Sequence, residues 1–277
     1  MAKTDKEKIE IELDNKEKAL AQAPVIVSAS RSTDIPAFYC DWFFHRLKVG
    51  YSAWTNPFNG VKMYVSYAKT RFIVFWSKNP RPLLEHIDEL KARGIGCYIQ
   101  YSLNDYEEEK LERGVPPLAE RIETFKKLVD VLGKGSVIWR FDPLVLTEDI
   151  TIEKLLNKIE NIGDQLKGYT EKLVFSFVDI LSYNKVKNNL KANGISFVDW
   201  TEEQMTEFAS RLVALNKEKG WNYKLATCGE RGRYPGVEPN HCIDDELIIK
   251  KSFHDKELMN YLKAEIKPIP PRDMFTN

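Results

Sequence analysis

A repeated pattern is the strongest constraint on how this 277-residue chain can fold. Seven short apolar runs of strand character each end in polar residues, and a helical pattern usually follows. The runs cover residues 25–30, 51–55, 72–76, 97–101, 137–141, 173–177 and 223–226. Strands that alternate with helices build a parallel sheet, which gathers functional side chains at the carboxyl ends of its strands. The sequence therefore predicts an α/β fold with one functional edge.

The length of the chain fits one large α/β domain. We expect a TIM-barrel-like (β/α) barrel over residues 24–277 that is mostly parallel, with an eighth, closing strand not legible. Residues 1–23 form a charged leader, in which 9–13 alternates like an edge strand and 16–22 has a helical pattern. The turn-like residues 268–271 complete no element, which suggests further chain beyond them.

Two local signals mark element boundaries. Asn59-Gly60 predicts a tight turn, so a small hairpin is expected within the second strand-to-strand connection. Thr201 and Gln204 have the spacing of a capping box, in which each side chain satisfies a backbone donor at the other residue. A helix is therefore expected to begin after Thr201.

Composition limits the classes of partner. The 41 basic and 41 acidic residues balance, so no global field attracts nucleic acid or an anionic membrane. No apolar stretch approaches the roughly 20 residues that span a bilayer, and the amino terminus lacks a secretory apolar core. We expect a soluble, cytoplasmic protein. Four cysteines are too few for a disulfide framework in this length, so reduced thiols are expected.

Charged residues at the strand exits are the first candidates for chemistry. Arg31 and Asp34 follow the first run, and Lys78 and Asn79 follow the third. Arginine and lysine bind carboxylate or phosphate, and the neighbouring polar groups orient such a ligand. Asp34 and Asn79 are equally well placed as helix caps, and Arg31 is placed to pair with Asp34.

Arg140 and Asp142 flank Phe141 at the end of the fifth run. Because strand side chains alternate, Arg140 and Asp142 should point the same way, into the predicted mouth of the barrel. A basic and an acidic group together there favour a functional site. The alternative is that Asp142, which precedes Pro143, only makes a turn.

The sixth run is apolar except for Ser176 and ends at Asp179, a candidate acid, base or ligand-orienting group whose alternative role is a helix cap. The catalytic candidates are Arg31, Asp34, Lys78, Arg140, Asp142, Asp179 and Glu230. The cofactor-binding candidates are Ser30, Asn79 and Ser176.

Cys228 leaves the last run, and Cys242 follows the loop after it. Thiolates bind soft metal ions and carry redox chemistry, so both cysteines are candidate metal ligands. The chain has no CxxC string, and a zinc site needs about four ligands, which here would include Cys228, His241, Cys242 and one more. Buried, inert cysteines are the alternative.

Five separated strings, at residues 28–39, 56–58, 74–80, 138–143 and 242–244, resemble the bacterial family called domain of unknown function 1848. The resemblance covers about residues 25–250. Members of that family resemble radical S-adenosylmethionine enzymes, because they usually end in a CxxxCxxC string of the kind that holds a [4Fe-4S] cluster. The resemblance therefore implies a [4Fe-4S] cluster and S-adenosylmethionine as cofactors.

This sequence contains no CxxxCxxC string. Cys228 and Cys242 match cysteines of the family pattern, which implies that they are catalytic thiols or additional metal ligands. An iron–sulfur cluster commonly needs four protein thiolates, or three with a ligand that completes the site. Two cysteines do not meet that need.

Three hypotheses of function follow. The first is an uncharacterised enzyme of the radical S-adenosylmethionine type, with a small anionic ligand at the carboxyl ends of the strands. The second is a repair-type protein that acts on nucleic acid, which the neutral charge disfavours because phosphate binding needs a basic track. The third is a catalytically silent binding module. No membrane partner is expected.

Overall fold

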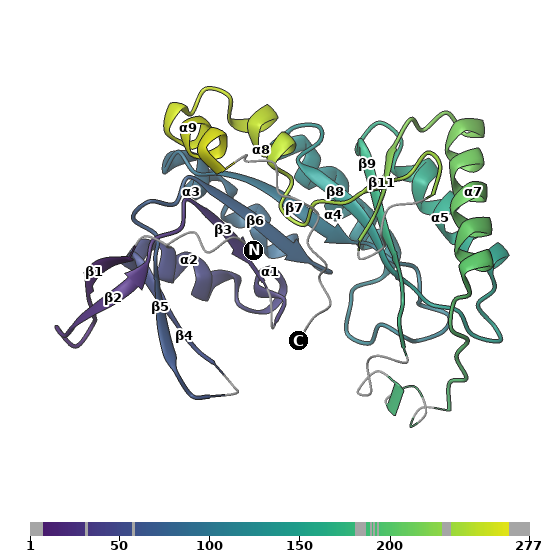
Figure 1. Cartoon of the computed structure of the whole chain (residues 1–277), viewed down its shortest axis with the longest axis horizontal. Coiled ribbons are helices and arrows are strands. Elements are labelled where there is room, and N and C mark those ends of the chain that lie inside the picture. Colours follow the sequence, from purple (N-terminus) through teal and green to yellow (C-terminus); the bar gives the residue numbers. More distant parts are fainter. Residues whose placement is uncertain are drawn as a thin grey trace.

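The computed structural model describes residues 8–30, 33–56, 59–180, 187–188, 190, 192, 194–228 and 234–265. Its larger sheet has seven strands, and every neighbouring pair is parallel. The strand order is β11 (Glu238–Pro239), β10 (Lys224–Thr227), β9 (Lys172–Phe177), β8 (Val137–Leu144), β7 (Gly96–Ser102), β6 (Phe72–Ser77) and β3 (Ile26–Ala29) (Figure 1). The predicted α/β fold with mostly parallel strands is confirmed.

Within the described residues, neither sheet closes on itself, so a complete barrel is not observed. Six of the seven predicted runs lie in the larger sheet, and its seventh strand is the two-residue β11, which the pattern did not predict. Residues 51–55 were wrongly assigned to the parallel sheet. They form β4 (Tyr51–Thr55), which pairs antiparallel with β5 (Lys62–Ser66) in a second sheet, so the predicted hairpin is confirmed.

The second sheet has the order β1-β2-β5-β4 and includes the leader. Residues 8–12 form β1 (Lys8–Glu12) as expected, but the helix expected at residues 16–22 is wrong because β2 (Lys18–Gln22) occupies that segment. Strand β2 pairs with β1 on one side and β5 on the other, and this pairing buries Ala21 completely. Pairing on both sides thus overrides the local helical pattern.

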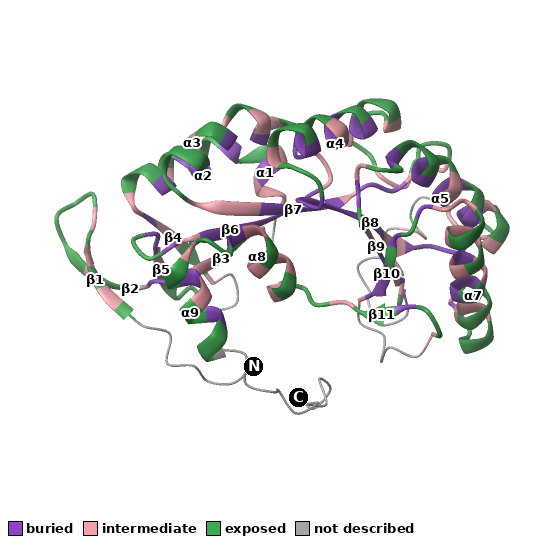
Figure 2. Ribbon diagram, turned by 90° about the horizontal axis from the view of Figure 1, so that it is seen from above, coloured by how far each residue is buried: buried purple, intermediate pink, exposed green. Residues whose placement is uncertain are grey.

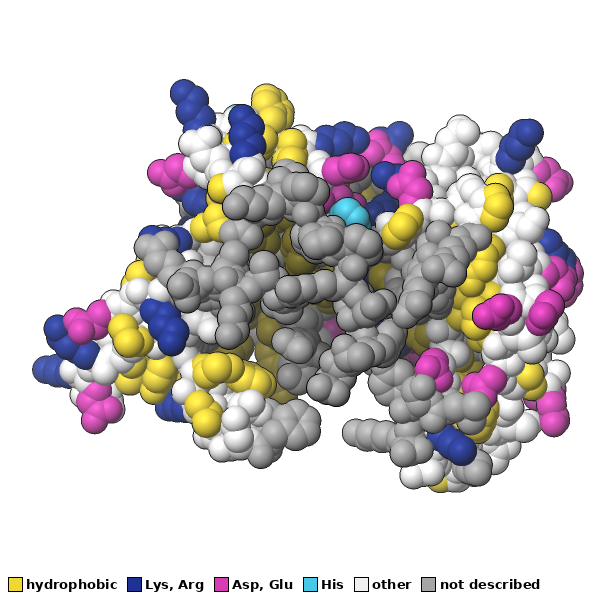
Figure 3. Space-filling model, in the orientation of Figure 1, with side chains coloured by type: hydrophobic (Ala, Val, Ile, Leu, Met, Phe, Trp, Pro, Cys, Tyr) yellow, Lys and Arg dark blue, Asp and Glu magenta, His cyan; other side chains and the backbone are white. Residues whose placement is uncertain are grey.

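The second sheet also presents apolar side chains to solvent, and Figure 3 shows hydrophobic groups gathered in the region of β4 and β5. The exposed ones in this sheet and its turn are Leu20, Trp54, Val61 and Met63.

None of the described helices is both long and apolar enough to cross a bilayer.

Helices cover the two faces of the larger sheet unequally (Figure 2). One face packs against α2 (Cys40–Val49), α3 (Ile87–Ala92), α4 (Leu118–Leu132), α5 (Ile152–Leu166) and α7 (Glu202–Glu218), joined by the short α1 (Ile35–Phe38) and the 3-10 helix η1 (Arg81–Glu85). Helix α7 begins with the predicted capping box at Thr201 and Gln204. Part of the opposite face is covered by α8 (Asp245–Ser252) and α9 (Lys256–Glu265).

A small core beneath α8 and α9 fixes where polar groups can lie on that face. Ile248, Leu258 and Leu262 from these helices pack against buried strand residues. The strand residues of this core are Phe72, Val74, Tyr98, Ile138, Val174 and Ala226. Because strand side chains alternate, the residue two positions further along each strand lies on the same face, closer to the carboxyl edge.

Candidate functional site: a thiolate and guanidinium cluster at the carboxyl edge

The residues two positions beyond this small core are almost all polar, unlike the core itself. They come from five adjacent strands or strand ends: Trp76, Gln100, Arg140, Ser176 and Cys228. Strand pairing keeps them on one face, so the sheet itself assembles this cluster at its carboxyl edge. The predicted residues Arg140, Ser176 and Cys228 are thus brought together.

Arg140 is the centre of the cluster and is only 3% exposed. Its Nε donates to Asp142 Oδ2 at 3.1 Å, its Nη2 donates to the same carboxylate, and its Nη1 donates to Gln100 Oε1 at 3.3 Å. Its guanidinium carbon lies 5.0 Å from the centre of the Trp76 ring, a cation–π contact. Burial acts to lower the pKa of Arg140, but the charges of Asp142 and Cys228 and the hydrogen bonds to them together outweigh burial, so the pKa is raised.

Asp142 is held from three directions. Besides Arg140, the Ser176 hydroxyl donates to Asp142 Oδ1. The Asn104 side chain makes two hydrogen bonds to the backbone of Asp142: it accepts from the N–H at 2.8 Å and donates to the carbonyl at 3.1 Å. Strand β8 continues to Leu144, so Asp142 is a strand residue and the alternative of a simple turn is wrong.

Cys228 accepts hydrogen bonds from a guanidinium group and from a side-chain amide. Arg140 Nη2 lies 3.2 Å from Cys228 Sγ, and Asn240 Nδ2 lies 3.0 Å from it. The hydrogen bond from Cys242, together with the charge of Arg140, lowers the pKa of Cys228 to about 6 against the opposing effect of burial. At neutral pH Cys228 is therefore a thiolate.

Cys242 has the opposite titration behaviour, because it is the donor in the sulfur–sulfur hydrogen bond. That bond and partial burial raise the pKa of Cys242, so its proton stays in place while Cys228 is ionised. Cys242 is exposed and Cys228 half-buried, so neither is the fully buried, inert cysteine that was the alternative. The structure thus brings both predicted thiols into one pair.

The segment before α8 is held along the sheet, and this holds Asn240 and Cys242 against Cys228. Strand β11 pairs with β10, and the Asn240 N–H donates to the Thr227 carbonyl at 2.7 Å. Just beyond, the Asp244 N–H donates to the Tyr98 hydroxyl at 2.9 Å. The thiol pair is therefore positioned by backbone contacts on both sides of Cys242.

Lys78 joins the same edge through a second chain of polar contacts. Its Nζ is paired with Glu112, whose Oε1 accepts from Asn104 Nδ2 at 2.9 Å. Asn104 in turn holds Asp142. The Lys78 side chain is 42% exposed, which makes it the cation of this network that solvent and a ligand can reach.

Asp34 has the structural role that was its alternative. Its Oδ1 accepts from the Ala37 N–H at 3.0 Å and caps α1, while its Oδ2 accepts from the Lys78 N–H at 2.7 Å. Ser30 supports the same turn, since its hydroxyl accepts from the Ile35 N–H at 3.1 Å. Both carboxylate oxygens of Asp34 therefore organise backbone beside the site.

The remaining predicted residues are not brought into the cluster by described contacts. Asn79 is half-buried and its N–H donates to Ser77 Oγ, but η1 begins after Pro80, so the alternative of Asn79 as its cap is wrong. Asp179 is exposed just beyond β9. Arg31 and Glu230 lie outside the described residues.

Sequence reasoning missed several members of the cluster. Gln100 interrupts an apolar strand just as Ser176 does, so the same signal was present. Asn104 lies among the polar residues that follow its strand, and that position was the signal used for the other candidate residues. Glu112 and Asn240 lie in long connections where no periodic pattern exists, so only the fold reveals their role.

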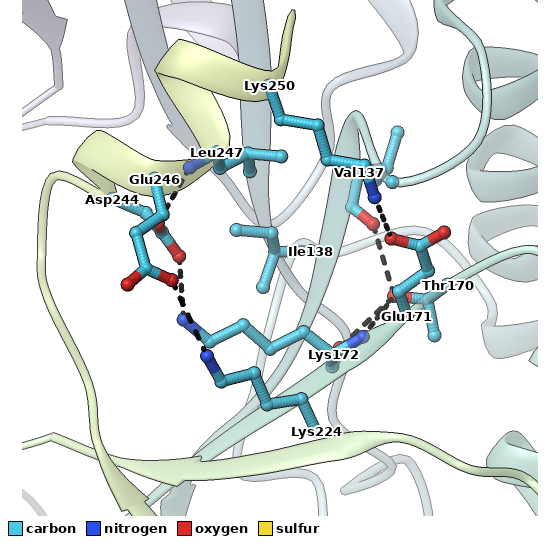
Figure 4. A pocket seen from close by; sticks show the side chains of 11 residues that line it. Val137, Ile138, Thr170, Glu171, Lys172, Lys224, Asp244, Glu246, Leu247 and Lys250 are labelled. Atoms are coloured by element: carbon cyan, nitrogen blue, oxygen red, sulfur yellow. Dashed lines mark hydrogen bonds and ion pairs between the residues drawn. The ribbon is translucent and has the colours of Figure 1, made fainter.

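A cavity with a volume of about 180 Å³ lies at the opposite, amino-terminal ends of β8, β9 and β10 (Figure 4). Lys172 Nζ lies 2.8 Å from Asp244 Oδ2, and Lys250 Nζ lies 2.8 Å from Glu171 Oε2. These pairs join α8 and the residue before it to the start of β9. The ion pairs anchor α8 to the sheet, and the cavity lies at the end of the strands opposite the cluster, so it is not our candidate site.

The four cysteines, all within the described residues, do not converge as an iron–sulfur cluster requires. Cys40 and Cys97 pack with the large core, on the face of the sheet that α2, α3, α4, α5 and α7 cover. Burial there raises the pKa of each to about 12. Only Cys228 and Cys242 meet, and a cluster needs three or four thiolates. In the part of the chain that is described, no group of three or more potential metal-ligating side chains occurs. These residues alone do not fit a [4Fe-4S] cluster.

Comparison with known proteins completes the description of the site. No curated protein and no solved structure matches the chain. A family model described as "Domain of unknown function (DUF1848)" matches residues 26–267, a range that includes every residue of the cluster. The match covers most of the chain, in agreement with the predicted resemblance, and the protein therefore belongs to the DUF1848 family.

Proposed function

We propose that this protein is an enzyme in which the Cys228 thiolate acts as a nucleophile on a small anionic ligand at the carboxyl edge of the parallel sheet. The observation that carries the proposal is the pair of hydrogen bonds to Cys228 Sγ, from Arg140 at 3.2 Å and from Asn240 at 3.0 Å. A thiolate is the nucleophilic form of cysteine, and a neighbouring cation is a common means of forming it. The carboxyl edge is the usual place for such chemistry in parallel sheets.

The charges of the edge indicate the class of ligand. Lys78 supplies a cation that is partly open to solvent, and Arg140 adds a buried one. Asp142 and Glu112 supply carboxylates beside them. A small molecule that bears a carboxylate together with an ammonium group matches both signs of charge. We therefore propose an amino-acid-like ligand.

S-adenosylmethionine, which the family resemblance implies, carries such a group and is the first molecule to test. The radical reaction that goes with it stays a prediction from the resemblance. Because the described cysteines do not supply a cluster site, the proposal routes no step through iron and sulfur. It assigns Cys228 as nucleophile, Arg140 as its electrostatic support and Lys78 as the carboxylate contact.

The test uses alkylation of the full chain by iodoacetamide, followed by peptide mass spectrometry. Cys228 should react with a midpoint near pH 6, because only the thiolate is alkylated. S-adenosylmethionine, free amino acids and small carboxylates are then added as protecting molecules. At least one should slow the alkylation of Cys228, and Lys78→Ala should weaken that protection about tenfold or more.

Lys91→Ala is the matched control, because it removes a lysine of α3 whose side chain pairs with exposed Asp88, away from the cluster. Protection in this variant should equal that in the unaltered chain. An alkylation midpoint near the ordinary thiol value of about 8.5 would exclude the nucleophilic thiolate. Failure of every added molecule to protect Cys228 would exclude the amino-acid-like ligand.

A further inference from the structure

We propose that a cavity beside the start of α2 is a binding site for a small quaternary ammonium compound. The cavity has a volume of about 240 Å³ and lies between the junction of α1 with α2 and the helix η1. The lining residues that carry the inference are Phe38, Tyr39, Asp41, Trp42 and Glu85. This site does not include Cys228, and the inference does not depend on the ligand proposed above.

The aromatic wall of the cavity comes from the way α1 ends and α2 begins. Helix α1 ends at Phe38, Tyr39 links the two helices in a non-helical conformation, and α2 begins directly after it. The buried residues of α2 recur at helical spacing and make its contacts with the core: Cys40, Phe43, Phe44 and Leu47. Phe38, Tyr39 and Trp42 lie outside that stripe and are exposed. Three aromatic side chains are thus presented to solvent around one cavity.

Two carboxylates add negative charge to this aromatic wall. Asp41 is exposed, and its Oδ1 lies 2.9 Å from His86 Nε2, which holds the carboxylate in place. Glu85 is exposed at the end of η1, and within the described part of the chain its carboxylate makes no hydrogen bond or ion pair. None of the described lining residues is basic, and the adjacent Arg81 pairs with Glu120 of α4 at 3.6 Å. The lining therefore favours a cation.

Aromatic faces and carboxylates together select the class of cation. A quaternary ammonium group carries its positive charge within a shell of methyl groups, so it contacts aromatic rings closely while the ring faces and the carboxylates attract its charge. A metal ion is a poorer match, because no group of three potential metal ligands occurs among the described side chains.

The volume of the cavity sets the size of the ligand. At about 240 Å³ it is smaller than the roughly 300 to 1,000 Å³ of most ligand pockets. A molecule of the size of choline therefore suits it better than a nucleotide or a long peptide. Choline is accordingly the probe, and its neutral isostere 3,3-dimethyl-1-butanol has the same shape without the charge.

The experiment titrates the full chain with choline chloride and follows the indole N–H signals of the tryptophans by NMR. The signal of Trp42, identified by its loss in Trp42→Leu, should shift to saturation, and sodium chloride at the same ionic strength should not shift it. The neutral isostere should bind at least about fivefold more weakly, because it lacks the cation–π attraction. The proposal is overturned if the Trp42 signal shows no saturable shift, or if the neutral isostere binds as tightly as choline.

Matched variants place the bound choline, with its own methyl signals reporting the affinity. Trp42→Leu should weaken binding about fivefold or more. Trp54→Leu is the control and should bind normally, because Trp54 is 41% exposed against 45% for Trp42 but lies on β4.

Glu85→Gln tests the charge of the lining and should weaken choline binding about twofold or more. Its control is Glu218→Gln, which removes an exposed carboxylate at the end of α7, on the other side of the molecule from α2 (Figures 1 and 2). All four substitutions are at exposed positions, and circular dichroism verifies that each variant is folded. Unchanged affinity in either Trp42→Leu or Glu85→Gln overturns the proposal.

Discussion

The Arg140 guanidinium lies 3.2 Å from the sulfur of Cys228, although 88 residues separate them in the chain. Arg140 comes from β8 and Cys228 follows β10, with β9 between these strands. The long arginine side chain therefore reaches across β9 on the face of the sheet that α8 and α9 only partly cover. This contact couples a buried cation to a thiolate, and most of the site's expected chemistry depends on it.

Removal of the Arg140 charge should raise the pKa of Cys228. Loss of an opposite charge within about 4 Å shifts a pKa by about 1 to 3 units, so Arg140→Gln should move the midpoint of Cys228 alkylation upward by at least about 1 unit. The pH profile of iodoacetamide labelling measures this shift. Arg93→Gln is the control, because it removes an arginine that pairs with Glu89 of α3, on the face of the sheet away from the cluster. An unchanged midpoint in Arg140→Gln would show that the guanidinium does not support the thiolate.

Titration of Cys228 should make the stability of the fold depend on pH. Its pKa is about 6 in the folded chain and about 8.5 when unfolded, so the unfolded chain binds more protons between these values. The free energy of unfolding should therefore rise with pH across this window, and that gain is lost as the pH falls through 6.

The expected gain is about 2 kcal/mol or less, and urea titrations at pH 6 and pH 8 measure it. Cys228→Ala should lack this part of the pH dependence. The raised pKa of Cys242 acts above about pH 8.5, outside the chosen window. Equal pH dependence in the unaltered chain and in Cys228→Ala would refute the assignment of a lowered pKa.

Alternation along strands explains which parts of the site could be predicted. Arg140 and Asp142 are two residues apart in one strand, so their shared face follows from the geometry of any β-strand. Ser176 and Cys228 join them because parallel neighbours in register present corresponding residues on the same face. These relationships need only the strand positions, which the apolar runs reveal.

The meeting of Cys228 with Cys242 could not be predicted in the same way. It depends on β11, a two-residue strand that leaves no periodic pattern. The strand nature of residues 18–22 was hidden for a related reason, since pairing with β1 and β5 overrides a locally helical composition. Contacts between segments distant in sequence decide both features.

Asn104 should prove essential to the shape of the site, because it is completely buried and satisfies both backbone groups of Asp142. Asn104→Ala leaves a buried N–H and carbonyl without these partners, at a cost of about 1 to 3 kcal/mol for each unsatisfied group. We expect unfolding in urea to require about 3 kcal/mol less free energy. Asn161→Ala on α5, whose side chain is exposed, should change stability by less than about 0.5 kcal/mol. Similar losses in both variants would contradict the role given to Asn104.

The ion pair between Lys172 and Asp244 should control the thiol pair from the other end of the sheet. Both side chains are largely buried, at 13% and 15% exposure, and removal of one partner of such a pair costs about 3 kcal/mol. Asp244 also caps α8 and lies two residues after Cys242. Lys172→Ala should therefore destabilise the fold and loosen the contact of Cys242 with Cys228.

Because the Cys242 hydrogen bond is the largest cause of the lowered pKa of Cys228, Lys172→Ala should raise the midpoint of Cys228 alkylation toward the ordinary thiol value. Lys224→Ala is the matched control: its side chain is 46% exposed and pairs with exposed Glu238 and Glu246, so the loss should be below about 1 kcal/mol. Alkylation profiles and urea titrations of the two variants measure both effects. If Lys172→Ala lowers stability but leaves the alkylation midpoint unchanged, the anchoring of α8 does not position Cys242, and the backbone contacts of Asn240 and Asp244 alone hold the pair.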